Sequence, residues 1–149
     1  MIKSRLIETA KKLKLPSPEA AVEYENKREQ IVFQMNEAML ARTDLSFLIG
    51  EGHIPMMKDN HKNHALFVSS ILASHQPEAL VETMLWVFRT YRSHGFDVNY
   101  WPAQLNQWIE ILETNLSETS LRQIYPFYNW FLTNHSAFIK LSDNADGKI

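Results

Sequence analysis

Apolar residues recur at helical spacing along most of the chain, and proline, glycine and serine mark the breaks between these stretches. No segment alternates apolar and polar residues with the period of a strand. The pattern predicts an all-α fold, a compact bundle of six to seven helices with short connections. The helices are expected over 2–14, 18–42, 55–74, 77–94, 99–116 and 117–141, with a short turn at 44–50.

Particular residues predict where the helices begin and end. Ser17 followed by Pro18 and an acidic residue is typical of a helix start, and Gly95 is typical of the residue after a helix. Asn99 is expected to cap the helix that follows Gly95. Pro126 falls inside the last apolar stretch, so a kink is expected in a long final helix.

Length and charge indicate one domain with no specialised chemistry in its composition. The 149 residues suffice for one core, which is expected over residues 1–142, with a flexible tail over 143–149. The net charge of −2 does not favour nucleic-acid binding, and the absence of cysteine excludes disulfides and thiolate metal sites. No apolar run is long enough to span a membrane and no signal peptide precedes the domain, so a cytoplasmic location is expected.

Several polar-tipped side chains share the core-facing stripes of the predicted helices. At about 100° per residue, His61 and His64 lie on one stripe with apolar residues, and His135 lies on another. A small domain seldom turns so many polar tips inward, so these positions are candidates for a ligand pocket. The pocket candidates are His61, His64, Tyr91, His94, Trp101, Tyr128 and His135.

The spacing of His61 and His64 is also compatible with a metal site. Residues at i and i+3 share a helix face and can bind one ion, but a zinc site needs three or four protein ligands. The remaining ligands would come from His53, His94, His135 or a carboxylate of another helix. Hydrogen bonding of both histidines within the core is the favoured alternative.

Two tryptophans point away from the core stripes of their helices. Trp86 and Trp130 lie either beneath a neighbouring helix or on a surface that contacts a partner protein. The basic residues of the first helix, such as Lys11 and Lys12, are interpreted as a solvated face rather than a membrane or nucleic-acid surface. Neither a strained nucleophile turn nor paired inward carboxylates are found, so the chain is expected not to be an enzyme.

The segment from Tyr91 through Gly95 to Trp101, followed by two further helices, resembles the sensor globins of bacterial signalling proteins and the non-heme globin domains of stressosome co-antagonist proteins. The resemblance covers about residues 55–141 and implies a globin-like sensory domain. In heme-binding members the proximal histidine lies four residues before this glycine, where this chain has Tyr91. The substitution implies a domain without heme, and a heme held between His64 and His94 is the alternative.

Together these features predict a non-enzymatic regulatory or sensory module that binds a small ligand or a partner protein and acts as a dimer. Dimerisation is expected through the last two predicted helices. Because the chain ends soon after them, any signal is expected to pass to a separate protein. The alternative is a heme- or metal-binding protein that uses the inward histidines.

Overall fold

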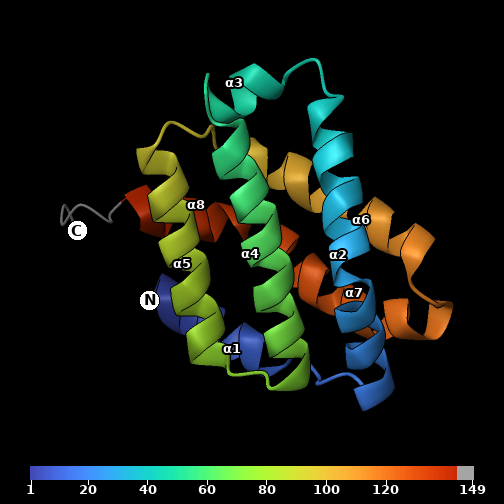
Figure 1. The fold of residues 1–149 in the computed structure, drawn as a ribbon. Helices are drawn as coiled ribbons and strands as arrows, with labels where there is room; N and C mark the ends of the chain where they lie inside the picture. Colours follow the sequence, from blue (N-terminus) through green and yellow to red (C-terminus); the bar gives the residue numbers. More distant parts are fainter. Residues whose placement is uncertain (144–149) are drawn as a thin grey trace.

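The computed structural model describes residues 1–143, which form eight α-helices and no strand (Figure 1). The all-α prediction is confirmed, and the additional helices are the short α3 and a separate α8. The helices are α1 (Ile2–Lys11), α2 (Pro18–Leu40), α3 (Leu45–Ile49), α4 (Ile54–Ala73), α5 (Pro77–Ser93), α6 (Tyr100–Asn115), α7 (Glu118–Thr133) and α8 (His135–Asp143). No helix within these 143 residues has the length and apolar character needed to cross a membrane.

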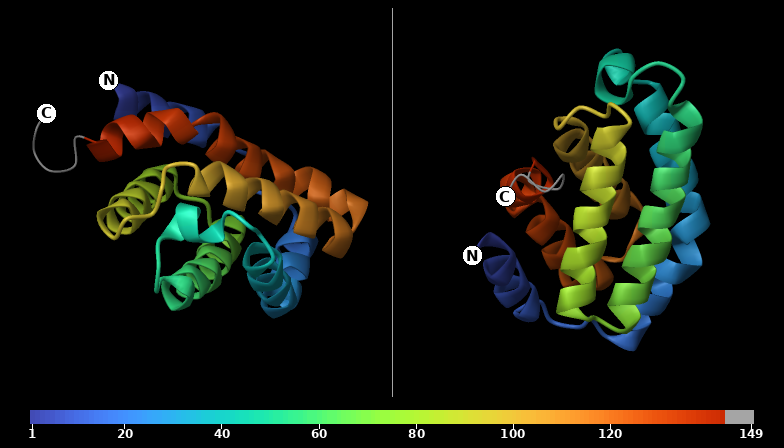
Figure 2. Two further views of the ribbon diagram at one scale, coloured as in Figure 1. Left: turned by 90° about the horizontal axis from the view of Figure 1, so that it is seen from above. Right: turned by 90° about the vertical axis from the view of Figure 1, so that its left-hand side faces the viewer.

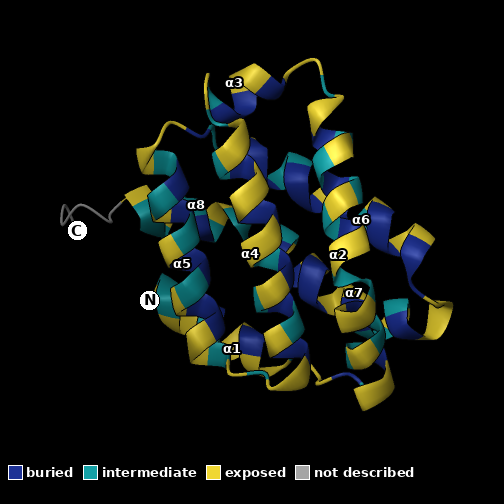
Figure 3. Ribbon diagram, viewed as in Figure 1, coloured by how far each residue is buried: buried dark blue, intermediate teal, exposed yellow. Residues whose placement is uncertain are grey.

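The helices form two layers that cross each other. Helices α2, α4 and α5 lie side by side with α4 in the middle, and α1, α6, α7 and α8 lie behind them (Figures 1 and 2). Buried residues line the space between the layers, whereas the outer faces are exposed (Figure 3). The buried interior is rich in aromatic rings, including the fully buried Trp108, Tyr24, Tyr100 and Tyr128.

Most predicted helix ends are confirmed. The Ser17 hydroxyl accepts a hydrogen bond from the Ala20 amide at 3.1 Å, and Gly95 has a φ of +94° that a residue with a side chain seldom adopts. Asn99 makes no capping hydrogen bond with its side chain. Instead, its amide donates to the Asp97 carboxylate at 2.9 Å in the turn before α6.

The last helix differs from the prediction. One helix over 117–141 was expected, but α7 ends at Thr133 and α8 begins at His135, so the break at Asn134 lies eight residues beyond Pro126. At the break, the Asn134 side chain donates to the Trp130 carbonyl at 2.9 Å. A side-chain amide that takes a carbonyl of the last turn competes with continuation of the helix. Helix α8 includes Asp143, and the rest of the expected tail, 144–149, lies outside the described residues.

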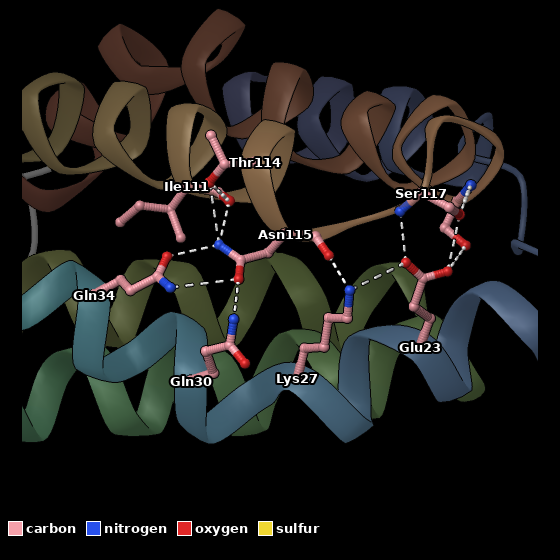
Figure 4. A network of polar contacts seen from close by, with 9 residues as sticks. Glu23, Lys27, Gln30, Gln34, Ile111, Thr114, Asn115 and Ser117 are labelled. Carbon is pink, nitrogen blue, oxygen red and sulfur yellow. Dashed lines mark hydrogen bonds and ion pairs between the residues drawn. The ribbon is translucent and has the colours of Figure 1, made fainter.

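A polar junction attaches α2 to the turn between α6 and α7 (Figure 4). Asn115 donates to the Gln34 side chain at 2.6 Å and to the Ile111 carbonyl at 2.7 Å, and it accepts from Gln30. Lys27 donates to the Asn115 carbonyl. This group, called the Asn115 cluster below, fixes the C-terminal end of α6 against α2.

Candidate functional site

A cavity of about 260 Å³ lies between α4, α5 and α6. Its walls are mostly apolar or aromatic, as in most pockets that bind small molecules. Trp86 belongs to the lining although 63% of it is exposed, so its indole lies where the cavity meets solvent. The lining residues are Asn60, Asn63, His64 and Phe67 of α4, Thr83, Met84, Trp86, Val87 and Tyr91 of α5, and Trp101, Gln104 and Leu105 of α6.

Three buried polar side chains form a hydrogen-bonded cluster at the cavity wall. The Tyr100 hydroxyl donates to Asn60 Oδ1 at 2.8 Å, and Gln104 Nε2 donates to the Tyr100 hydroxyl at 3.0 Å and to Asn60 Oδ1. We call this group the Asn60 cluster. Gln104 Oε1 has no hydrogen-bond partner within residues 1–143 and is not enclosed by protein. The Asn60 side chain also hydrogen-bonds the Tyr91 hydroxyl, which leaves one of the two N–H groups of Nδ2. Both amide residues line the cavity, so the Asn60 cluster presents one donor N–H and a free acceptor.

His61 lies behind this cluster rather than in the cavity lining. Its Nδ1 lies 2.6 Å from Asn36 Oδ1, and its Nε2 lies 3.5 Å from the Tyr100 hydroxyl. Since an amide oxygen only accepts, Nδ1 carries the proton in this bond. Burial lowers the pKa of His61 to about 3, so its ring is uncharged at neutral pH.

His64 connects the cavity wall to a second buried chain of hydrogen bonds. Its Nε2 lies 2.9 Å from the Tyr128 hydroxyl, which lies 2.8 Å from the Tyr24 hydroxyl. The ring stacks on Trp108 with centroids 4.8 Å apart. Burial, together with the nearby ring of His61, lowers the pKa of His64 to about 3. The chain joins α4, α7 and α2 through uncharged groups.

His61 and His64 both make hydrogen bonds within the core, which is the alternative to a metal site. His61 faces Asn36, and His64 directs one nitrogen to Tyr128. Within residues 1–143, no group of three or more histidine, aspartate or glutamate side chains is arranged to hold a metal ion. The two histidines thus have no additional protein ligand nearby, whereas a zinc site needs three or four ligands.

The structure brings Tyr91 and Trp101 into the same cavity wall. Tyr91 is 8% exposed, and burial raises the pKa of its hydroxyl. Trp101 packs against Phe88 with ring centroids 4.6 Å apart, and its indole N–H is buried without a partner among the described residues. A buried donor without an acceptor is unusual in a folded protein. It lies in the wall of a cavity that can hold a ligand.

The remaining pocket candidates lie elsewhere. His94 is exposed, and its ring bonds the Thr90 carbonyl at 2.8 Å near the end of α5. His135 donates from Nε2 to the Val98 carbonyl at 3.1 Å and so fixes α8 to the turn before α6. Tyr128 is fully buried behind His64. None of the three lines the cavity.

Of the two tryptophans expected to point away from the core stripes, one lies beneath a neighbouring helix and the other is exposed. Trp130 is 6% exposed and lies beneath a neighbouring helix, where its indole N–H donates to the Thr9 hydroxyl of α1 at 2.9 Å. It therefore belongs to the contact between α7 and α1. Trp86 remains exposed at the rim of the cavity and keeps its role as a candidate for partner contact.

The cavity does not fit the heme that the resemblance offers as an alternative. His64 directs its Nε2 to Tyr128, and His94 lies outside the lining, so the expected pair does not face a shared space. A volume of about 260 Å³ is also below the roughly 300–1,000 Å³ of pockets for drug-sized ligands, and heme is larger than such ligands. The lining suits a smaller molecule.

Sequence reasoning did not identify the Asn60 cluster. Asn60 precedes His64 by one helical turn, and Gln104 lies next to Leu105, so both were close to core-facing positions. The helical phase thus indicated that both amides lie near the core, but asparagine and glutamine at such positions are common at the edge of a core and do not by themselves indicate a site. Only packing shows that both are buried and face a cavity.

Comparison with known proteins identified no relative of this chain. No family model, no curated protein and no solved structure matches the chain. The globin-like arrangement implied by the segment from Tyr91 to Trp101 therefore stays a prediction, and function is argued from the cavity alone.

Proposed function

We propose that this chain is a regulatory or sensory module that binds a small molecule in the cavity between α4, α5 and α6. The observation that carries the proposal is an apolar cavity whose wall contains buried amides with unused hydrogen-bonding atoms. Such a combination of apolar walls with a few oriented polar groups is typical of ligand sites. The proposal keeps the sensory role implied by the resemblance to sensor globins, now assigned to a particular cavity.

The protonation states in the lining favour binding over acid–base catalysis. A general acid or base works best with a pKa near the working pH. Burial moves the pKa of His64 down to about 3 and the pKa of Tyr91 up, so neither group changes charge near neutrality. The remaining polar lining groups are amides, a threonine hydroxyl and indole N–H groups, which recognise a ligand through hydrogen bonds.

A bound molecule would bias the packing of both layers. His64 lines the cavity and also bonds Tyr128, and through it Tyr24, so the occupied site is connected to α7 and α2. A protein partner or a second copy of the chain that contacts Trp86 would respond directly to a ligand at the rim of the cavity. Between residues 99 and 141, Tyr125 is the only large hydrophobic residue that is exposed, so the structure favours the rim over the last helices as the contact surface.

Saturation-transfer NMR with toluene tests whether the cavity accepts an apolar molecule. Val87→Phe places a larger ring in the lining, and Val22→Phe makes the same change at a site that is 55% exposed on α2. We expect toluene to bind the wild type and Val22→Phe, and to lose at least about tenfold in affinity for Val87→Phe. Equal binding to both variants, or none to the wild type, would overturn the proposal.

A further inference from the structure

The chemical class of the ligand can be inferred from the lining, an inference that rests on the proposed function. None of the twelve lining residues is Asp, Glu, Lys or Arg. The one titratable base among them, His64, is uncharged at neutral pH. A charged ligand would lose its hydration without gaining an opposite charge, which is costly in a mostly apolar site. The lining therefore selects an uncharged molecule.

The buried tyrosines determine which nitrogen of His64 carries its proton. Tyr24 is fully buried, and the Tyr128 hydroxyl is the one partner of its hydroxyl within residues 1–143. If Tyr24 donates to Tyr128 and Tyr128 donates to His64 Nε2, every hydroxyl proton in the chain is bonded. The opposite direction leaves the Tyr24 proton buried and unpaired, which is unfavourable. The favoured direction leaves the proton of His64 on Nδ1.

That proton is available to a ligand. Nδ1 of His64 has no hydrogen-bond partner among the described residues and is not enclosed by protein, and the ring lines the cavity. One helical turn earlier, Asn60 offers a second donor through Nδ2, while Gln104 offers an acceptor through Oε1. In this arrangement the Tyr100 hydroxyl donates to Asn60 Oδ1 and accepts from Gln104 Nε2, so Nδ2 of Asn60 and Oε1 of Gln104 are the atoms left over.

We propose that the cavity binds a small uncharged carboxamide or lactam with an apolar body. Its carbonyl oxygen accepts from His64 Nδ1–H and from Asn60 Nδ2, and its N–H donates to Gln104 Oε1. The apolar body packs against the side chains of Phe67, Met84, Val87 and Leu105, which come from all three helices of the site. A carbonyl oxygen has two lone pairs, so it can accept both donors.

Three probes of one size separate this inference from the proposed function. Toluene has only the apolar body, benzamide adds the uncharged amide, and benzoate replaces the amide with a charge. We expect benzamide to bind at least about tenfold more tightly than toluene, and benzoate more weakly than either. If toluene binds and benzamide binds no better, amide recognition is overturned and the cavity remains. If benzoate binds best, the uncharged class is overturned, and if no probe binds, the proposed function fails too.

A variant and a spectroscopic measurement test the named atoms. Gln104→Leu removes the acceptor and keeps the volume, so we expect it to lose the preference for benzamide over toluene while still binding toluene. An unchanged preference would contradict the role of Gln104. Should this variant fold poorly, the tautomer of His64 in the wild type decides, because two-bond ¹H–¹⁵N correlations distinguish the protonated ring nitrogen. Protonation at Nε2 would overturn the proposed donor.

Discussion

Two polar clusters lie toward the two ends of α6, and they differ in how completely their hydrogen bonds are satisfied. At the C-terminal end, both side-chain atoms of Asn115 are bonded to protein, and its carbonyl accepts from Lys27 (Figure 4). Toward the N-terminal end, the Asn60 cluster is bonded internally and to Tyr91 but leaves Gln104 Oε1 and one N–H of Asn60 Nδ2 free beside a cavity.

The difference separates a structural role from a binding role. A cluster whose hydrogen bonds are all made within the protein fixes the position of two helices, and nothing remains for a ligand to bond. A cluster with free atoms next to empty volume would be unfavourable unless water or a ligand completes it. The same two residue types, asparagine and glutamine, thus serve two purposes in one helix, and predictions can test whether the two ends behave differently.

The largest expected effect is a loss of stability in weak acid on the cavity side. Burial holds the pKa of His61 and of His64 near 3 in the folded state, against about 6.5 when unfolded. As the pH falls below 6.5, the unfolded chain binds protons that the folded chain does not, so the free energy of unfolding decreases. The decrease is roughly 2 kcal/mol for each histidine between pH 7 and pH 5, and about 4 kcal/mol for the two together.

Urea denaturation of the wild type and of His64→Phe at both pH values measures this contribution. The variant loses the bond to Tyr128 at every pH, but its stability should change by about 2 kcal/mol less than the wild type between pH 7 and pH 5. An identical pH dependence in both proteins would contradict an uncharged, buried His64.

The next largest effect should come from the chain that links the cavity wall to α2 and α7. Tyr128→Phe removes both of its hydrogen bonds and leaves the Tyr24 hydroxyl and His64 Nε2 without a partner. Two unpaired polar groups of this kind cost about 3 kcal/mol together. Tyr24→Phe leaves Tyr128 free to bond His64, so we expect a loss of about 1 kcal/mol by urea denaturation. Equal losses would show that the two hydroxyls do not form one directed chain.

A direct comparison of the two ends of α6 should give a smaller difference. Asn115→Ala leaves Gln30 and Gln34 without their partner in a cluster that fixes two helices, at a cost of about 2 kcal/mol. Asn60→Ala also removes hydrogen bonds, but water can enter the adjoining cavity and bond the groups left behind, so about 1 kcal/mol is expected. A loss for Asn60→Ala that equals or exceeds the loss for Asn115→Ala would remove the distinction.

Much of the fold could be predicted because its signals are local. Proline and serine at Pro18 and Ser17, and glycine at Gly95, determine helix ends through the backbone alone. The end of α7 was wrong in the sequence reading because Pro126 is the stronger local signal, whereas the break depends on an Asn134 side chain that bonds a carbonyl of the preceding turn.

The candidate site was predictable in part. Helical phase correctly turned His61, His64, Tyr91 and Trp101 inward, because the phase is a property of one helix. Phase does not show which inward residues from different helices meet, so it left out Gln104. His94 became a candidate through its expected pairing with His64, and its ring lies outside the cavity. The cavity exists only once α4, α5 and α6 are packed, and hydrogen-bond direction follows from that packing.

The smallest effect concerns acid sensitivity at the other end of α6. The Glu23 carboxylate accepts from the Ser117 amide at 2.6 Å and from the Ser117 and Ser120 hydroxyls, at the N-terminus of α7. These bonds, first of all the one from the backbone amide, lower the pKa of Glu23 below its ordinary 4.5. The stabilisation is therefore present above pH 4.5 and is lost as the pH falls through the lower value of the folded state.

Glu23→Gln should isolate the contribution of the Glu23 charge to stability, because glutamine keeps one acceptor and removes the charge. We expect the variant to be about 0.5–1 kcal/mol less stable than the wild type at pH 7 by urea denaturation, with the difference shrinking toward pH 3. Glu29→Gln, at an exposed site on the same helix, controls for the general loss of a negative charge. If the Glu23 difference persisted unchanged at pH 3, the charge would not be its cause. If the difference instead grew between pH 7 and pH 5, the two ends of α6 would share one pH window, and the separation of a binding end from a structural end would fail.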